Sequence, residues 1–223
     1  MKRTKLSDRQ LPDYSQGEEI MNMVSHIAGG ALGIVALVLC VVKAAVSGNI
    51  PGVVGSAIYG ASLIALYTVS SVYHGLKPGT AKKVLQVIDH CTIYILIAGS
   101  YTAVLLSAMR SVYPAIGWGL LAAEWILAGT AATLTAIDLR KYRVFSMICY
   151  IGMGWGIVFF LPQALEALTL PGFLFLLSGG IVYTIGAILY GIGSKKHWFH
   201  SVFHIFVVLG SFLHFLSILL YAL

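Results

Sequence analysis

KKHWFHSVFHIFVVLGSFLHFLSILLYAL occupies residues 195–223 of the chain. After its lysines, this segment is apolar over the length of about 20 residues that a helix needs to cross a bilayer. His200 and His204 are one helical turn apart on the same face, so their imidazoles can bind one metal ion. His214 lies about 15 Å farther along the axis, too far to share that ion.

The composition of the whole chain agrees with a membrane-spanning segment at this position. Hydrophobic residues make up 59% of the 223 residues, charged residues only 10%, and the mean hydropathy is +0.90. A soluble domain has about 25% charged residues, so this composition excludes a soluble globule. The apolar residues form seven runs, each close to spanning length, at 21–45, 53–73, 84–108, 115–136, 145–161, 173–192 and 199–223.

These runs predict an all-α integral membrane protein, a seven-transmembrane helix bundle. The connections are too short for a separate soluble domain, so we expect a polar cytoplasmic segment at 1–19 followed by a single transmembrane domain at 20–223. This segment is polar and Pro12 interrupts any apolar core, so we expect no cleavable secretory signal there. The three scattered cysteines favour neither a disulfide framework nor a thiolate metal site: Cys40, Cys91 and Cys149.

The positive charges predict the orientation of the bundle. All lysines and arginines except Lys43 and Arg110 fall on one side of the predicted membrane: Lys2, Arg3, Lys5, Arg9, Lys77, Lys82, Lys83, Arg140, Lys141, Arg143, Lys195 and Lys196. The positive-inside rule therefore places the N-terminus in the cytoplasm and the C-terminus outside. Basic loops facing anionic membrane lipids explain the net charge of +6, so no nucleic-acid partner is expected.

Polar side chains gather near the cytoplasmic ends of three runs. Glu19, Asn22 and His26 form one stripe at helical spacing on the first run, and polar groups at this depth need partners, so we expect a bundle-facing network. Ser70 and His74 form a second pair at the end of the second run. These two groups lie at the same predicted leaflet.

Asp89 opens the third run at that leaflet as well. An aspartate inside an apolar helix costs about 2.5–3.5 kcal/mol, so it needs a cation, a network or water. Together with His74, His200 and His204 it supplies three imidazoles and an oxygen, the composition of an open catalytic zinc site. The absence of thiolates and of clustered carboxylates disfavours iron–sulfur and magnesium centres.

Two further ionisable residues lie within predicted spans. Glu124, in the middle of the fourth run, has no obvious partner, and a packing role and a functional role are both open. We interpret His214 as a histidine hydrogen-bonded inside the bundle, with the lining of a proton or substrate cavity as the alternative.

Several short motifs follow one another along nearly the whole chain: Glu19-x-x-Asn22-x-x-Ser25-His26, Ser70-x-x-x-His74, Asp89-His90-x-x-Ile93-Tyr94, Ala98-Gly99-Ser100-Tyr101-Thr102 and His200-x-x-x-His204. In this order they resemble the signatures of the haemolysin III branch of the progestin and adipoQ receptor family, which is related to the alkaline ceramidases. The resemblance implies a buried zinc held by three ligands, His74, His200 and His204. It further implies that Asp89 contacts the zinc through a water, with Ser70 nearby as a second catalytic residue.

The resemblance also implies an activity, the zinc-dependent hydrolysis of an amide or ester bond in a lipid-like substrate that enters from the membrane. One alternative is a non-enzymatic receptor-like or membrane-homeostasis protein in which zinc only links helices. Another is a pore-forming haemolysin, which is disfavoured because such a toxin must be secreted and insert from water. Transport ranks lower, because the polar groups cluster at one leaflet. The sequence determines neither the substrate nor the oligomeric state.

Overall fold

The computed structural model describes residues 4–193 and 196–223, so the charges expected at Lys2, Arg3 and Lys195 lie outside the described residues. All regular structure in the described residues is helical. The helices are α1 (Gln16–Val46), α2 (Ile50–Gly75), α3 (Thr80–Val104), α4 (Arg110–Val112), α5 (Pro114–Ile137), α6 (Arg143–Gly154), α7 (Leu161–Gly193) and α8 (Phe199–Ser217). Leu105–Met109 and Ile218–Ala222 are π-helical, and Gly156–Phe160 is a 3-10 turn.

Local sequence signals explain where the first helices begin. The Ser15 side chain accepts from the backbone N–H of Glu18 at 3.3 Å, and the Glu18 side chain accepts from the backbone N–H of Ser15 at 2.9 Å. This reciprocal pair is a capping box, which satisfies two otherwise unpaired donors. Asn49 caps α2 by accepting from the backbone N–H of Gly52 at 2.9 Å.

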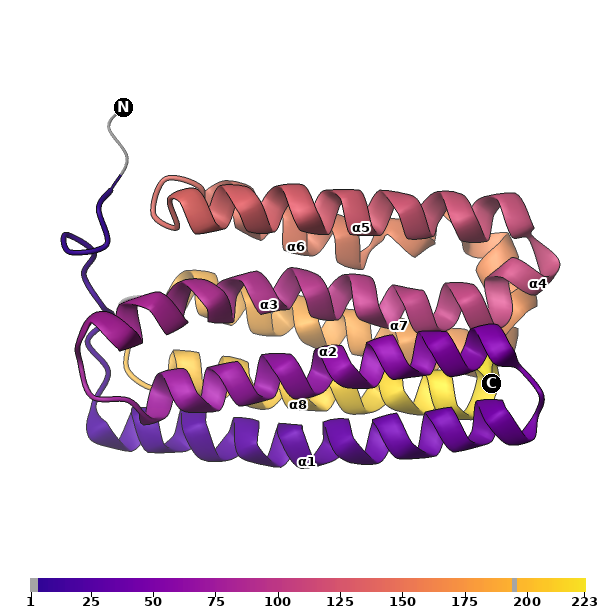
Figure 1. Cartoon of the computed structure of the whole chain (residues 1–223), viewed down its shortest axis with the longest axis horizontal. Helices are drawn as coiled ribbons and strands as arrows, with labels where there is room; N and C mark the ends of the chain where they lie inside the picture. The colour runs from indigo at the N-terminus through magenta and orange to yellow at the C-terminus, as the bar shows by residue number, and fades with distance from the viewer. Residues whose placement is uncertain (1–3, 194–195) are drawn as a thin grey trace.

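The long helices run side by side along the longest axis of the molecule (Figure 1). Helix α1 packs against α2 and α8, α2 against α3, α3 against α5, and α7 against α8. The close approach of α1 and α2 requires Gly60, because a Cβ there would lie 2.5 Å from the Cβ of Leu37. In α8, Ser211 Oγ lies 2.6 Å from the hydroxyl of Tyr67 in α2 and 2.7 Å from that of Tyr183 in α7. These bonds fix the register of α8 against α2.

The outer surface of the bundle is apolar, as expected for helices that face lipid. Ile27, Ile34 and Val38 of α1 are about half exposed, whereas Ala36 and Cys40 on its other side are completely buried. Such an exposed apolar face is unfavourable in water and favourable in a bilayer.

Among the residues that the structure describes, six helical stretches are long and apolar enough to cross a membrane, one fewer than the sequence predicted. The predicted run 145–161 and all but the last residue of the predicted run 173–192 fall within one stretch, Arg143–Gly191. Within α7, Thr169 has non-helical dihedral angles (φ 61°, ψ 164°), and Pro171 follows it. The stretch Arg143–Gly191 is therefore interrupted at Thr169, although its length and composition count it as one span.

The connecting segments with basic residues gather at one end of the bundle, where the N-terminal segment also lies. The backbone N–H of Thr4 donates to Asp138 at 2.8 Å, and Lys83 donates to the carbonyl of Ser7 at 2.7 Å. The Asp138 carboxylate also accepts from the backbone N–H groups of Arg140 and Lys141. Together with the bond from Thr4, these hydrogen bonds lower the pKa of Asp138 to about 2. The C-terminus lies at the opposite end (Figure 1).

Candidate metal centre

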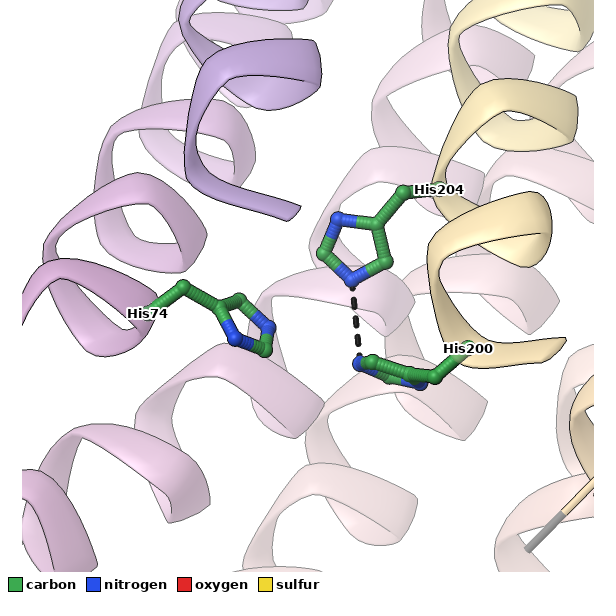
Figure 2. A group of neighbouring side chains, drawn as sticks. All are labelled: His74, His200 and His204. Carbon is green, nitrogen blue, oxygen red and sulfur yellow. Dashed lines mark hydrogen bonds between the residues drawn. The ribbon is translucent and has the colours of Figure 1, made fainter. Parts of the chain in front are cut away.

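Three histidines from two helices converge at the end of the bundle where the N-terminal segment lies. His74 is in the last turn of α2, while His200 and His204 are in the first turns of α8. One ring nitrogen from each histidine lies within 4.8 Å of the other two. Figure 2 shows the three rings facing one common point, with Nε2 of His200 and Nε2 of His204 joined at 3.0 Å.

The imidazole nitrogens are suited to a metal ion. His74 donates its Nδ1–H to Glu19 Oε2 at 2.6 Å, so its Nε2 carries the lone pair. That Nε2 is buried and has no hydrogen-bond partner in the described part of the chain. A tetrahedral zinc with bonds of about 2.0–2.1 Å holds its nitrogen ligands about 3.3 Å apart, so modest side-chain rotation would bring the three nitrogens to these positions. The group can therefore hold a metal ion.

Glu19 connects His74 to a buried cation, Lys82. The Lys82 ammonium donates to Glu19 Oε1 at 2.6 Å and to the carbonyl of Leu76 at 2.9 Å. Only 3% of Lys82 is exposed. A carboxylate behind a metal-ligating imidazole fixes the tautomer and the ring orientation, and Lys82 holds that carboxylate in place. Sequence reasoning assigned Lys82 only to a basic loop.

Asn22 and His26 also contact the histidine group. Asn22 is fully buried, and its Nδ2 lies 3.4 Å from Nδ1 of His74. The ring of His26 stacks on that of His204 with centroids 3.8 Å apart, and neither of its ring nitrogens has a partner in the described residues. The stripe from α1 thus packs directly against two of the three imidazoles.

Asp89 and Ser70 lie beside this group rather than in it. The ligand group within 4.8 Å does not include Asp89. The Ser70 hydroxyl donates to the Asp89 carboxylate, and both side chains border the same cavity. His90 donates its Nδ1–H to the carbonyl of Gln86 at 2.8 Å, so this proton is not available to the neighbouring carboxylate. The Asp89 carboxylate keeps free lone pairs toward the cavity.

A cavity extends from the histidines toward the middle of the bundle. It has His200, His204 and Asp89 at one end. Most of the wall is apolar or aromatic, for example Leu96, Ile97, Trp155, Tyr183, Phe203 and Val207. Such a cavity suits an apolar molecule that presents a polar group to the histidines.

Tyr14 covers the opposite side of the histidine group. Its ring stacks on His200 with centroids 4.8 Å apart and an angle of 11° between the planes, and it lies 5.9 Å from the His74 ring. Burial raises the pKa of the Tyr14 hydroxyl, which therefore stays neutral. Sequence reasoning did not identify Tyr14, because it lies in the polar segment before the first helix.

The other two intramembrane ionisable residues are separate from the histidine group. His214 donates Nε2–H to the carbonyl of Leu176 at 3.1 Å and also lines the cavity. Only 3% of Glu124 is exposed, and it forms no ion pair within the described residues.

Comparison with known proteins gives one consistent family. A family model described as Haemolysin-III related matches residues 14–215. The chain is 37% identical to Hemolysin-3 of Bacillus cereus over 206 residues, which cover 92% of each chain. It is 34% identical over 204 residues to the Hemolysin-3 homolog of Bacillus subtilis (strain 168), covering 92% of this chain and 94% of the relative.

A more distant relative is the Monocyte to macrophage differentiation factor of Homo sapiens, 25% identical over 169 residues, which cover 72% of this chain and 67% of the relative. No solved structure matches the chain.

Proposed function

Because the chain belongs to the haemolysin III branch of the progestin and adipoQ receptor family and is a multi-pass membrane protein, we propose that it hydrolyses an amide or ester bond of a membrane lipid at a zinc site. The observation that carries the proposal is the convergence of three imidazoles, from His74, His200 and His204, two of which line one end of an apolar cavity.

The donor set favours zinc. Imidazole nitrogens suit zinc, copper, iron and nickel, and three histidines with an open fourth position are the arrangement of catalytic zinc sites. When bound there, zinc supplies a water of pKa about 7 and polarises a carbonyl oxygen. The hydrogen bond from His74 Nδ1 to Glu19 orients the imidazole ring and leaves its Nε2 free to bind the metal, which supports this assignment.

The surrounding side chains supply the remaining chemistry. Asp89 takes the proton from the attacking water and returns it to the leaving amine or alcohol, while the water oxygen bonds to the carbonyl carbon and the carbon–nitrogen or carbon–oxygen bond breaks. Ser70 donates to the Asp89 carboxylate and so orients it for this transfer. Glu19, Asn22 and His26 support the ligands, since all three contact the histidine rings.

The cavity supports a lipid-like substrate. Its apolar wall fits a hydrocarbon chain, whereas the polar groups at its histidine end fit an amide or ester. Entry from the membrane avoids exposing such a chain to water. The partners proposed are therefore membrane lipids, with no nucleic acid.

Seven passes and a cytoplasmic N-terminus form part of this proposal. A straight helix over Arg143–Gly191 would be about 74 Å long, more than twice the hydrocarbon thickness of about 30 Å, so the chain has to turn near the non-helical Thr169. Termini at opposite ends of the bundle support an odd number of passes (Figure 1). The basic residues beside the N-terminal segment support its cytoplasmic location, with 20–223 as the transmembrane domain.

One competing function, a structural zinc in a receptor-like or membrane-homeostasis protein, has an observation in its favour. The ligands come from α2 and α8, so an ion between them would link the two helices even without turnover. A pore-forming haemolysin, which the names of the bacterial relatives suggest, is supported by no feature of the histidine group.

Reconstitution separates hydrolysis from the structural role. The purified, zinc-loaded protein is incubated in vesicles of bacterial lipid extract, and the lipids are then analysed by mass spectrometry. We expect zinc-dependent release of free fatty acid, with no release by chelator-treated protein. An unchanged lipid profile from protein that holds one zinc per chain would support the structural role instead.

Substitution of Glu19 by glutamine tests the support of His74. Glutamine keeps the shape but removes the charge that faces His74 and Lys82, so we expect zinc affinity to fall about 10–100-fold. Zinc titration against a competing chelator measures this change. Glu166→Gln, a substitution of an exposed glutamate near the start of α7 whose partner is Tyr113, serves as the matched control. Equal affinities for Glu19→Gln and the control would show that Glu19 does not support the ligand.

A further inference from the structure

We propose that Glu124, Tyr101 and the carbonyl end of α6 form a second ion site, which binds a small monovalent cation such as sodium near the middle of the membrane. This site is separate from the histidine centre and does not depend on the proposed hydrolysis.

The first observation is the isolation of the Glu124 side chain. Glu124 lies near the middle of α5, which spans Pro114–Ile137, and is only 3% exposed. Its Oε2 is buried with no hydrogen-bond partner, and no lysine, arginine or histidine forms an ion pair with it in the part of the chain that the structure describes. A carboxyl group at this depth costs several kcal/mol unless a partner compensates it, so its partner has to be identified.

The second observation is the space beside Gly156. A Cβ built on Gly156 would lie 3.2 Å from Glu124 Oε1 and 3.4 Å from Tyr101 Oη, so both oxygens border the space that a side chain would fill. The Tyr101 hydroxyl donates to the carbonyl of Gly154 at 3.3 Å and accepts from the backbone N–H of Ile157 at 2.8 Å. A carboxylate oxygen and a phenol oxygen therefore lie together beside Gly156, and the phenol connects them to the carbonyl of Gly154.

The third observation is the end of α6 at this point. Helix α6 stops at Gly154, and the 3-10 turn Gly156–Phe160 follows. The C-terminal end of a helix carries a partial negative charge and has carbonyls without helical partners. In interrupted membrane helices, carbonyls at the C-terminal end of the first half coordinate sodium ions or protons.

The charge of Glu124 and the oxygen donors around it determine which ion the site would bind. Oxygen donors bind hard cations, in contrast to the nitrogen donors of the histidine centre. One carboxylate balances one positive charge, whereas a divalent ion would leave an uncompensated charge in the membrane. A proton would need only one of these oxygens, but several are gathered here. Tyr101 and Gly154 also line the cavity that reaches the histidines, so the proposed site lies beside that cavity.

Thermal unfolding of the zinc-loaded, full-length protein in detergent tests the site. At constant ionic strength, replacing choline chloride by sodium chloride should raise Tm by about 5 °C at saturation, because only the folded state binds the ion. Glu124→Gln, which keeps the size but removes the charge, should abolish the sodium-dependent shift. Gly156→Ala, which fills the space and keeps the charge, should reduce it. Glu166→Gln should keep the full shift.

Two outcomes would overturn the site. The first is an equal Tm of the wild-type protein in sodium and in choline, which would mean that Glu124 is protonated and binds no metal cation. The second is a sodium-dependent shift that persists in Glu124→Gln, which would place the ion elsewhere. The zinc content of Glu124→Gln should equal that of the wild type, so failure of the sodium site is distinguishable from failure of the histidine site.

Discussion

Asp89→Ala is expected to reduce lipid hydrolysis by about 10²–10⁴-fold while leaving zinc bound, because a positioned proton acceptor contributes that much to the rate. Asp89 lies outside the group of ligand nitrogens and accepts from Ser70 at the cavity wall. Its removal therefore takes away the proton acceptor without removing a metal ligand. Fatty-acid release in reconstituted vesicles measures the rate, and elemental analysis of the same samples measures zinc.

Two further variants make this prediction specific. Asp13→Ala changes an exposed aspartate of the N-terminal segment and should hydrolyse at the wild-type rate. Asp89→Asn keeps the size of the side chain but loses its basicity, so its hydrolysis should also be lost. Wild-type hydrolysis by Asp89→Ala would contradict the catalytic role, and loss of its zinc would show that Asp89 is a direct ligand.

The second large effect is expected for His204→Ala. This variant should lose zinc affinity by at least about 100-fold, since one of only three protein ligands is removed. Elemental analysis of purified protein should give one zinc per wild-type chain and little in the variant. Its Tm should also fall, because the ion no longer links α2 to α8.

His214→Ala is the matched control for His204→Ala. Both histidines lie on α8 and line the same cavity, but His214 bonds to the carbonyl of Leu176 and is remote from the other imidazoles. Its substitution should leave zinc content unchanged. Equal zinc in His204→Ala and the wild type would mean that the metal, if present, binds elsewhere.

Much of the fold follows from local sequence patterns. Apolar runs of spanning length predict helices, and the separation of four residues between His200 and His204 predicts one shared face, because both depend only on helix geometry. The number of spans depends on how the apolar stretch Arg143–Gly191 is divided. Thr169 and Pro171 interrupt one long apolar stretch, so length and composition alone give six spans where separate runs predict seven.

The additional partners of the histidines depend on tertiary packing and could not be predicted in the same way. Lys82 has the sequence context of a loop lysine, but the fold buries it beside Glu19. Tyr14 precedes the first helix and reaches His200 only because the N-terminal segment crosses the end of the bundle. Glu18, which caps α1, also accepts from the backbone N–H of Trp198 at 2.6 Å.

Glu124 illustrates the same limit within a span. Its position in an apolar run marks it as unusual, but its neighbours come from two other helices. The space at Gly156 and the hydroxyl of Tyr101 become adjacent to Glu124 only when α3, α5 and α6 pack together. No spacing rule along one helix relates these residues.

X-ray absorption at the zinc edge of the purified wild-type protein tests the histidine site most directly, because it reports the atoms bound to the metal. The arrangement of His74, His200 and His204 predicts three imidazole nitrogens at about 2.0–2.1 Å and one further light atom, with no sulfur. A spectrum with sulfur ligands, or one with a shell of oxygens and no imidazole, would contradict the assignment of the metal to these three histidines.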